Sequence, residues 1–258
     1  MKINDEILRI LQKSLVVGDI VYLPEGQLDR KTYEAVNKCL ANLGGKWNRS
    51  KKGHVFDHDI SDAFEVMLMT GETEDMKKTF QFFPTPPAAA DLMCDMAELS
   101  HISILLEPSC GDGALLVAAR ERGVTALFGI EINTGMEIYL EAMPFDVKIL
   151  WADFLTLEGG CFDDDPHRVR FDRILMNPPF TKQQDIAHIR HAYDFLEPGG
   201  ILVAVCSPGP FFRKDRKSTE FGEWICGLDA EIVDVPEGAF KESGTSIRTK
   251  IIKIRKQA

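Results

Sequence analysis

Strand-like and helix-like patterns alternate along the chain from residue 79 onward. The expected strands cover residues 102–106, 126–130, 147–151, 171–176, 200–206, 230–235 and 245–254. The expected helices cover residues 87–99, 114–122, 136–142, 184–196 and 216–226. Alternation of this kind predicts an α/β domain with a mostly parallel sheet of seven strands and helices on both faces. Only residues 236–244 separate the last two strands. That is too short for a crossover helix, so the last strand should be antiparallel.

The first 75 residues follow a different pattern. Helices are expected over residues 4–13, 29–43 and 60–70, a strand over 19–23, and a β-hairpin over 46–56. We therefore expect a small α+β module over residues 1–75. The polar stretch 71–78 is the expected linker, and the second domain would cover residues 76–258.

Composition excludes several classes of protein. No apolar run approaches the length of a membrane span, and the start, Met1-Lys2-Ile3-Asn4, does not indicate a signal peptide. The six cysteines lack C-x-x-C spacing, so we expect no metal, no disulfides and a cytoplasmic location. The net charge of −10 argues against polyanion binding by the whole surface, but it is compatible with a local basic patch.

The tetrapeptide Asn177-Pro178-Pro179-Phe180 follows the expected strand 171–176. Proline fixes φ and lacks an N–H, so this segment leaves the sheet as a rigid loop. Ligands of α/β proteins bind at this edge of the sheet. The Asn177 side-chain oxygen and the Pro178 carbonyl can each accept an N–H, and Phe180 can stack on a ring. The four residues therefore suit a planar group that carries an exocyclic amine.

Three more segments lie at expected strand ends. Residues 107–113 form a glycine-containing turn between a strand and a helix, which lets the backbone approach a ligand closely. Glu131 ends the next strand, where a carboxylate meets the hydroxyls of a ribose. Asp153-Phe154 end the third and offer an acceptor and a ring for an adenine. Upstream, Thr85 is expected to cap a helix with Pro86 at its first position.

These blocks, in this order, resemble those of the class I amino-group methyltransferases that use S-adenosylmethionine, above all the DNA N6-adenine enzymes. Residues 83–86 resemble motif X, residues 107–113 motif I, Glu131 motif II, Asp153-Phe154 motif III, and residues 177–180 motif IV. The resemblance covers about residues 80–256 and implies a Rossmann-like fold.

The resemblance also implies roles for individual residues. The cofactor would be S-adenosylmethionine, and no metal is implied. Its expected ligands are Phe83, Thr85, Glu107, Ser109, Gly111, Asp112, Gly113, Glu131, Ile132, Asp153, Phe154 and Asn177. The catalytic residues would be Asn177, Pro178, Pro179 and Phe180.

A target adenine in duplex DNA would have to be flipped out of the stack. Phe180 and Phe240 would then replace the original stacking, Phe240 from a segment that resembles motif VIII. The choice of adenine over cytosine depends on Asn177, because cytosine-N4 enzymes usually carry serine there. Related loops also serve RNA adenine, RNA guanine and protein glutamine methylation.

Basic residues surround Trp47 on the expected hairpin, and a second basic loop follows residue 212. Cations beside an aromatic ring suit phosphate contact and base stacking. The expected nucleic-acid contacts are Lys46, Trp47, Arg49, Lys51, Lys52, Arg213 and Lys214. We expect a nucleic-acid partner, most readily DNA, no membrane, and a monomer or homodimer.

No substantial target-recognition domain follows motif IV. We therefore expect a short or relaxed target sequence, as in compact phage and mobile-element enzymes that evade restriction. Two alternatives stay open: transfer to RNA or protein, and a catalytically silent DNA-binding or anti-restriction module. A Rossmann dehydrogenase is disfavoured because Leu116 stands where its third glycine would be.

Overall fold

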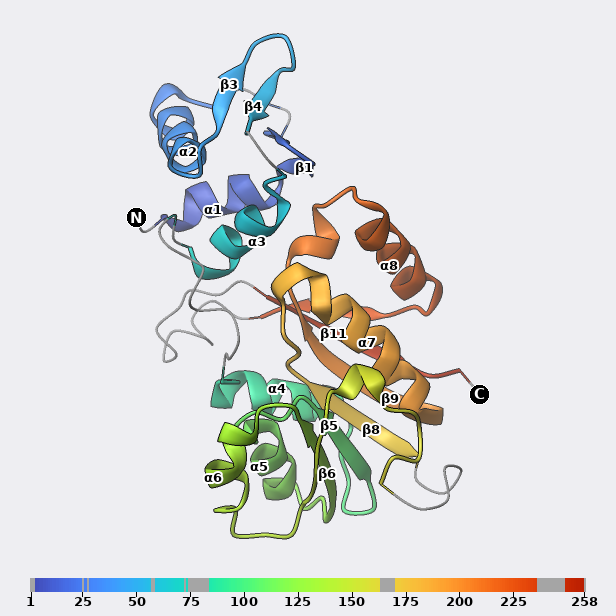
Figure 1. Ribbon diagram of the computed structural model, residues 1–258. Helices are drawn as coiled ribbons and strands as arrows, with labels where there is room; N and C mark the ends of the chain where they lie inside the picture. The colour runs from blue at the N-terminus through green and yellow to red at the C-terminus, as the bar shows by residue number, and fades with distance from the viewer. Residues whose placement is uncertain are drawn as a thin grey trace.

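The computed structural model describes residues 3–24, 26, 28–56, 59–71, 73, 84–162, 170–235 and 249–257. They form two sheets (Figure 1). The larger has seven strands in the order β10-β11-β9-β8-β5-β6-β7. We call residues 84–257 the α/β body. Residues 3–71, which hold the smaller sheet, are called the N-terminal module.

The α/β body confirms the expected mostly parallel sheet. Its strands are β5 (Ile104–Pro108), β6 (Ala126–Glu131), β7 (Lys148–Trp151), β8 (Phe171–Met176), β9 (Leu196–Cys206), β10 (Glu231–Asp234) and β11 (Lys250–Arg255). Strands β5 to β9 pair in parallel, and β11 is antiparallel to both β9 and β10. The carboxyl ends of the five parallel strands therefore meet at one edge.

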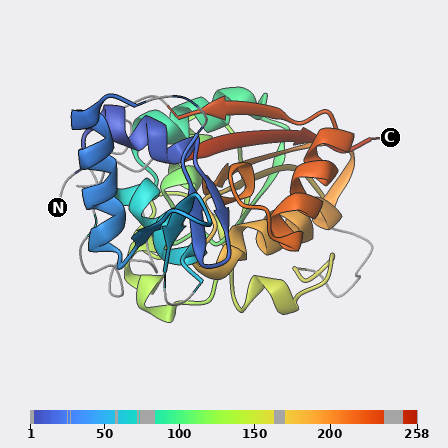
Figure 2. The ribbon, with the colours of Figure 1, turned by 90° about the horizontal axis from the view of Figure 1, so that it is seen from above.

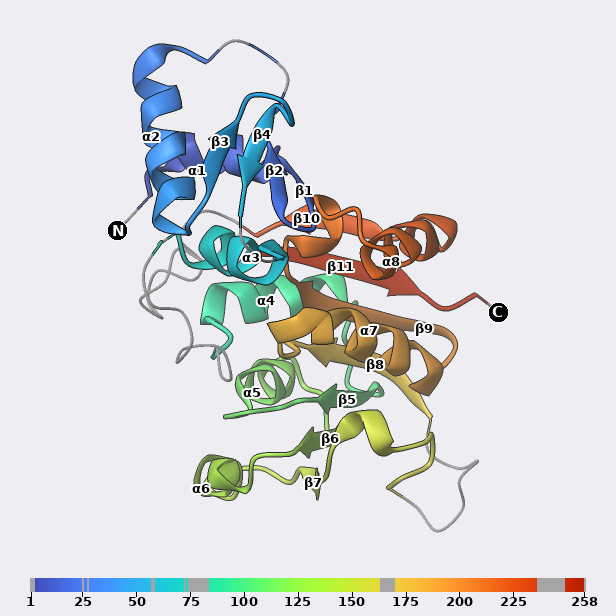
Figure 3. The same ribbon diagram turned by 45° about the horizontal axis from the view of Figure 1, so that its top comes forward.

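Helices cover both faces of this sheet (Figure 3). They are α4 (Pro87–Met96), α5 (Ala114–Glu121), α6 (Glu137–Leu140), α7 (Gln184–Phe195) and α8 (Arg216–Gly227). In β9, Ile201, Val203 and Val205 pack with α4, α5 and α6, whereas Leu202, Ala204 and Cys206 pack with α7 and α8. The apolar run of this strand thus reflects burial on both faces. Among the described residues, no helix has the length and apolar character needed to cross a membrane.

The N-terminal module combines a four-stranded antiparallel sheet with three helices. Its elements are α1 (Asp5–Gln12), β1 (Leu15–Val17), β2 (Ile20–Tyr22), α2 (Arg30–Asn42), β3 (Lys46–Asn48), β4 (Gly53–Val55) and α3 (Ser61–Thr70). Strand β1 was not expected, and it forms a hairpin with β2. The expected linker falls largely outside the described residues, so the domain boundary at residue 75 stays a prediction.

A buried ion pair joins the module to the α/β body. The module lies above the body in Figure 1, so it is in front of the body in Figure 2, which looks down from above. Arg213 Nη2 donates to Glu65 Oε2, and each side chain is only 4% exposed. The same guanidinium donates to the Ser61 carbonyl at 2.8 Å. Phe212 packs edge-on against Phe64 with ring centroids 5.5 Å apart. The predicted role of Arg213 as a nucleic-acid contact is therefore wrong, because its guanidinium is buried and paired with Glu65 inside the protein.

Arg213→Ala should destabilise the protein strongly, because it leaves the Glu65 carboxylate buried without its cation. Loss of one partner of a buried pair costs about 3–5 kcal/mol. Arg30→Ala, which removes an exposed pair with Glu34, should leave the urea midpoint nearly unchanged. Equal midpoint shifts for the two variants would contradict the structural role of the buried pair.

Candidate functional site

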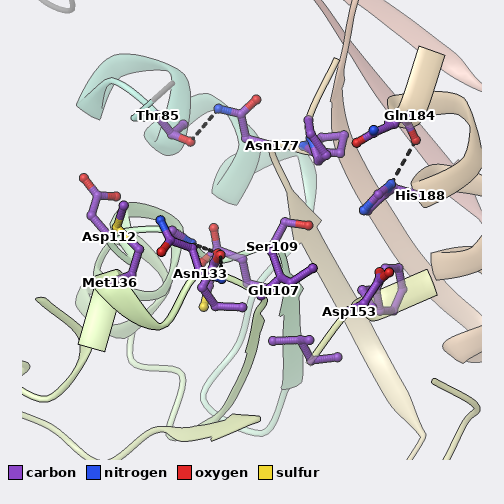
Figure 4. Close-up of a pocket in the computed structure, with 18 of the residues that line it drawn as sticks. Thr85, Glu107, Ser109, Asp112, Asn133, Met136, Asp153, Asn177, Gln184 and His188 are labelled. Carbon is purple, nitrogen blue, oxygen red and sulfur yellow. Dashed lines mark hydrogen bonds between the residues drawn. The ribbon is translucent and has the colours of Figure 1, made fainter. Parts of the chain in front are cut away.

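A cavity of about 600 Å³ opens at the carboxyl edge of the parallel strands (Figure 4). It is lined by the end of β5 and the turn after it, by the end of β6, by the segments after β7 and β8, and by the first turns of α7. Pro84 and Thr85, just before α4, close one side. The expected motif blocks therefore meet around one cavity.

The turn after β5 depends on its glycines. Gly111 has φ of 52° and Gly113 has φ of 79°, a left-handed conformation that other residues rarely adopt. A Cβ at Gly113 would overlap the Met143 side chain. The turn is held by the Gly113 N–H, which donates to the Cys110 carbonyl at 2.7 Å. The backbone at this turn can therefore approach a ligand without hindrance from a side chain.

Glu131 is fixed by two backbone amides. Its Oε2 accepts from Gly111 N at 2.8 Å and its Oε1 from Asn133 N at 2.7 Å. The residue ends β6 and is 8% exposed. Each carboxylate oxygen can accept a further hydrogen bond, so the pair fits the two hydroxyls of a ribose. Next to it, Ile132 is 68% exposed and lines the cavity with an apolar surface.

Glu107 lies deeper in the same wall. It is 2% exposed, and its Oε2 accepts from Leu116 N at 3.2 Å. Burial, reinforced by the nearby charge of Asp112, raises the pKa of Glu107 well above its usual value. A cation bound beside it would lower that pKa again.

The segment after β7 departs partly from expectation. Asp153 is exposed and its Oδ1 accepts from Leu155 N at 3.0 Å, which starts the short 3-10 helix Phe154–Thr156. Phe154 lines the cavity but is 3% exposed, with its ring 4.7 Å from that of His191 and 5.1 Å from that of Phe195. Phe154 is therefore part of the packed wall of the cavity, and its ring is not open for an adenine to stack on as the sequence predicted. Ile132 and Leu155 offer the exposed apolar surfaces.

Motif IV is tied to the segment before α4. Asn177 Nδ2 donates to Thr85 Oγ1 at 3.1 Å (Figure 4). The expected cap is wrong: Pro86 is the N-cap of α4 and Pro87 its first residue, with no side-chain cap. Thr85 instead orients the Asn177 amide. Phe180 lines the cavity but is 5% exposed and belongs to the core beneath α4, which limits its open surface.

Gln184 and His188 were missed, although both line the cavity from α7. Their i, i+4 spacing directly after motif IV was the available signal. His188 Nδ1 lies 2.9 Å from the Gln184 carbonyl, which can only accept, so Nδ1 carries the hydrogen. Burial lowers the pKa of His188. The neutral ring therefore presents Nε2 as an acceptor on the side of the cavity that holds Asp153 (Figure 4).

The remaining expected site residues divide between the cavity, the N-terminal module and the part of the chain outside the described residues. Ser109 and Asp112 line the cavity, whereas Phe83 and Phe240 fall outside the described residues. The hairpin residues Lys46, Trp47, Arg49, Lys51 and Lys52 belong to the N-terminal module and do not line the cavity. Trp47 is 46% exposed and its ring contacts His54 at 5.2 Å. Lys214 is exposed. Within the described ranges, no cluster of His, Cys, Asp and Glu could hold a metal.

Comparison with known families gives one family match. The model of the family described as N-6 DNA Methylase matches residues 56–185. That segment contains most of the cavity wall, from Pro84 through Asp153 to motif IV.

Two curated relatives are similar over part of the chain. A type II methyltransferase of Thermus thermophilus is 36% identical over 98 residues, which are 37% of this chain and 20% of the relative. A type II restriction enzyme and methyltransferase of Heyndrickxia coagulans is 24% identical over 159 residues, 51% of this chain and 24% of the relative. The chain thus spans about a quarter or less of the length of these relatives.

Among solved structures, the methyltransferase subunit of a type I restriction-modification system from Streptococcus thermophilus is similar with a TM-score of 0.57. It is 23% identical, and the match covers 88% of this chain and 54% of that one. At this identity the likeness shows a shared fold.

The buried carboxyl of Glu107 should make the protein less stable as pH rises. The unfolded chain ionises near the usual pKa of 4.5, while the folded pKa is raised. The loss therefore begins near that value and grows until the folded pKa is passed. Glu107→Gln keeps the acceptor for Leu116 and removes this loss. In urea unfolding at pH 8 it should gain at least about 1 kcal/mol, with a smaller gain at pH 5.

Glu137→Gln, on the exposed surface of α6, is the matched control and should show neither effect. A pH dependence identical in wild type and Glu107→Gln would contradict the assignment.

Proposed function

Because the chain belongs to the N-6 DNA methylase family, we propose that it transfers a methyl group from S-adenosylmethionine to the N6 amine of adenine in DNA. The observation that carries this proposal is the Asn177–Thr85 hydrogen bond, which holds motif IV over the same cavity that Glu131 enters. The proposed amine acceptor, Asn177, and the proposed ribose acceptor, Glu131, thus line one cavity.

The residues that line the cavity offer hydrogen-bonding groups and apolar surfaces that suit each part of the cofactor. Glu131 would hold the ribose hydroxyls, and Asp153 would accept from the adenine amine, with Ile132 and Leu155 packed on the ring. Thr85, Ser109, the backbone at Gly111 and Gly113, and the carboxylates of Glu107 and Asp112 would hold the methionine end. Bound there, S-adenosylmethionine supplies an electrophilic methyl group. No metal is needed for transfer to an amine.

The substrate amine would be prepared by two acceptors. The lone pair of adenine N6 is delocalised into the ring, which makes it a weak nucleophile. Thr85 fixes the Asn177 amide, so that its oxygen and the Pro178 carbonyl would each accept one N–H of the amine. This arrangement would favour a pyramidal nitrogen with an available lone pair, and the amine would lose its proton after it has gained the methyl group. Catalysis would thus come from preorganised acceptors and positioning.

The target base would have to leave the duplex, at a cost of a few kcal/mol. Pro179 stiffens the loop that receives it, and Phe180 and Phe240 are the proposed stacking partners. The hairpin of the N-terminal module, with Trp47 among lysines, would hold the nucleic acid. Protection of DNA against restriction is the biological role that we propose.

Asn177→Ala should lower methyl transfer to unmodified DNA by at least about 100-fold, because one of two preorganised acceptors is removed. Radiolabelled S-adenosylmethionine measures transfer, and calorimetry should show that the variant still binds the cofactor. Glu137→Gln is the control. Transfer by Asn177→Ala at the wild-type rate would contradict the proposal, and wild-type transfer only to RNA or protein would redirect it.

The hairpin makes a separate prediction. Arg49→Ala combined with Lys52→Ala should weaken binding to DNA and reduce the slope of log K against log salt by about 0.9 for each phosphate that the hairpin no longer neutralises. Lys13→Ala, an exposed cation of the same module outside the hairpin, should leave the slope unchanged. Fluorescence anisotropy at several salt concentrations measures both. Equal slopes for the hairpin variant and wild type would remove the hairpin from the interface.

A further inference from the structure

The segment directly after motif IV has an unusual backbone. Lys182 (φ 56°, ψ 31°) and Gln183 (φ 57°, ψ 39°) are both left-handed, although neither is glycine. The Gln183 N–H donates to the Phe180 carbonyl at 3.1 Å, so this turn closes on the last residue of motif IV. Strained backbone of this kind persists only where the surroundings hold it, and it concentrates at functional sites.

Three polar contacts hold Gln183 against the start of α8. Its Nε2 donates to Asp215 Oδ2 at 3.0 Å and to Ser218 Oγ at 3.3 Å. Its carbonyl accepts from Lys217 Nζ at 2.6 Å. The side chain is buried, at 7% exposure, although a glutamine after a catalytic loop would ordinarily face solvent. We call these contacts of Gln183 with Asp215, Lys217 and Ser218 the clamp, because they fix the turn.

The clamp is itself anchored to the N-terminal module. Asp215 caps α8 by accepting from Ser218 N at 3.0 Å, and it lies two residues beyond Arg213. Arg213 is held by Glu65 and Ser61 of the module. Gly209 N donates to Glu65 Oε1 at 3.3 Å and anchors the other end of the same segment. These contacts, together with the short backbone link from Arg213 to Asp215, therefore form one path from α3 of the module to the Phe180 carbonyl.

We infer that Gln183 is a positioning residue for motif IV, and that docking of the N-terminal module through Glu65 and Arg213 sets the geometry that Gln183 imposes. The inference rests on the proposed methyl transfer and adds to it a role for the module. Besides contacting nucleic acid, the module holds the segment that keeps the Asn177 and Pro178 acceptors in place.

Two single variants test the clamp. Gln183→Leu removes its donor, and Gln183→Glu sets a carboxylate against that of Asp215. Each should lower kcat by about tenfold or more, since small misplacement of reacting groups is costly. Cofactor affinity should change by less than about twofold, because Gln183 does not line the cavity. Glu220→Gln is the control, because Glu220 is an exposed residue of α8, the helix that Gln183 contacts. This variant should have wild-type kcat and cofactor affinity.

A swapped pair separates positioning from a general structural effect. In Gln183→Glu with Asp215→Asn, the donor and acceptor exchange places, and the amide oxygen introduced at position 215 can still cap α8. The double variant should recover kcat to within about threefold of wild type. Unchanged kcat in both single variants, or no recovery in the swapped pair, would overturn the inference.

Hydrogen exchange supplies a readout that does not need activity. Exchange of the amides of Asn177 and of residues 180–183 should rise in Gln183→Leu and return to the wild-type rate in the swapped pair, while β8 stays protected. If wild type transfers no methyl group, the proposed function fails, and exchange alone then decides the positioning role. Unaltered exchange in Gln183→Leu would overturn it.

The link to the module is tested by a double-mutant cycle. Glu65→Gln should lower kcat, and Gln183→Leu should cost less in that background than in wild type, because the same path is already broken. Independent, multiplicative losses would overturn the link. Thermal unfolding of each variant confirms that the protein remains folded during the assay.

Discussion

The parallel register of β5, β6 and β8 is the constraint on which the site depends. Leu106 pairs with Phe128 on one side and with Ile174 on the other, so the three strands end at the same level. A different functional group of the cavity stands at the end of each strand. The glycine turn follows β5, the Glu131 carboxylate ends β6, and the Asn177 amide follows β8. Helices on both faces keep this sheet buried and its edge open. Residues far apart in the sequence are thereby brought to one cavity.

Motif IV shows how a rigid scaffold and a strained loop combine. The two prolines of motif IV restrict the backbone angles of the loop itself. The left-handed turn at Lys182 and Gln183 restricts the backbone that follows the loop. The buried Glu65–Arg213 pair is a weak source of net stability, because desolvation offsets most of its attraction. Its use here is to fix one arrangement of module and body. In our account, that arrangement also positions the proposed catalytic loop, residues 177–180.

The sheet and the cavity were predictable because both follow from periodicity and from strand ends. Glu131 could be placed by its distance from the glycine turn, and the structure puts it on the cavity. Arg213 could not be placed, because a basic loop looks the same in sequence whether it faces solvent or a buried glutamate. Thr85 had a good local cap pattern, but a tertiary contact with Asn177 replaced it. His188 lacked a motif and became visible only through helix packing.

We propose that this protein methylates the N6 amine of adenine in DNA. The most direct measurement is to incubate the protein with S-adenosylmethionine carrying a trideuterated methyl group and unmodified DNA, then to digest the DNA and identify nucleosides by mass spectrometry. The account predicts label in N6-methyladenine alone. Label in N4-methylcytosine, or DNA without label under conditions where the cofactor binds, would contradict it.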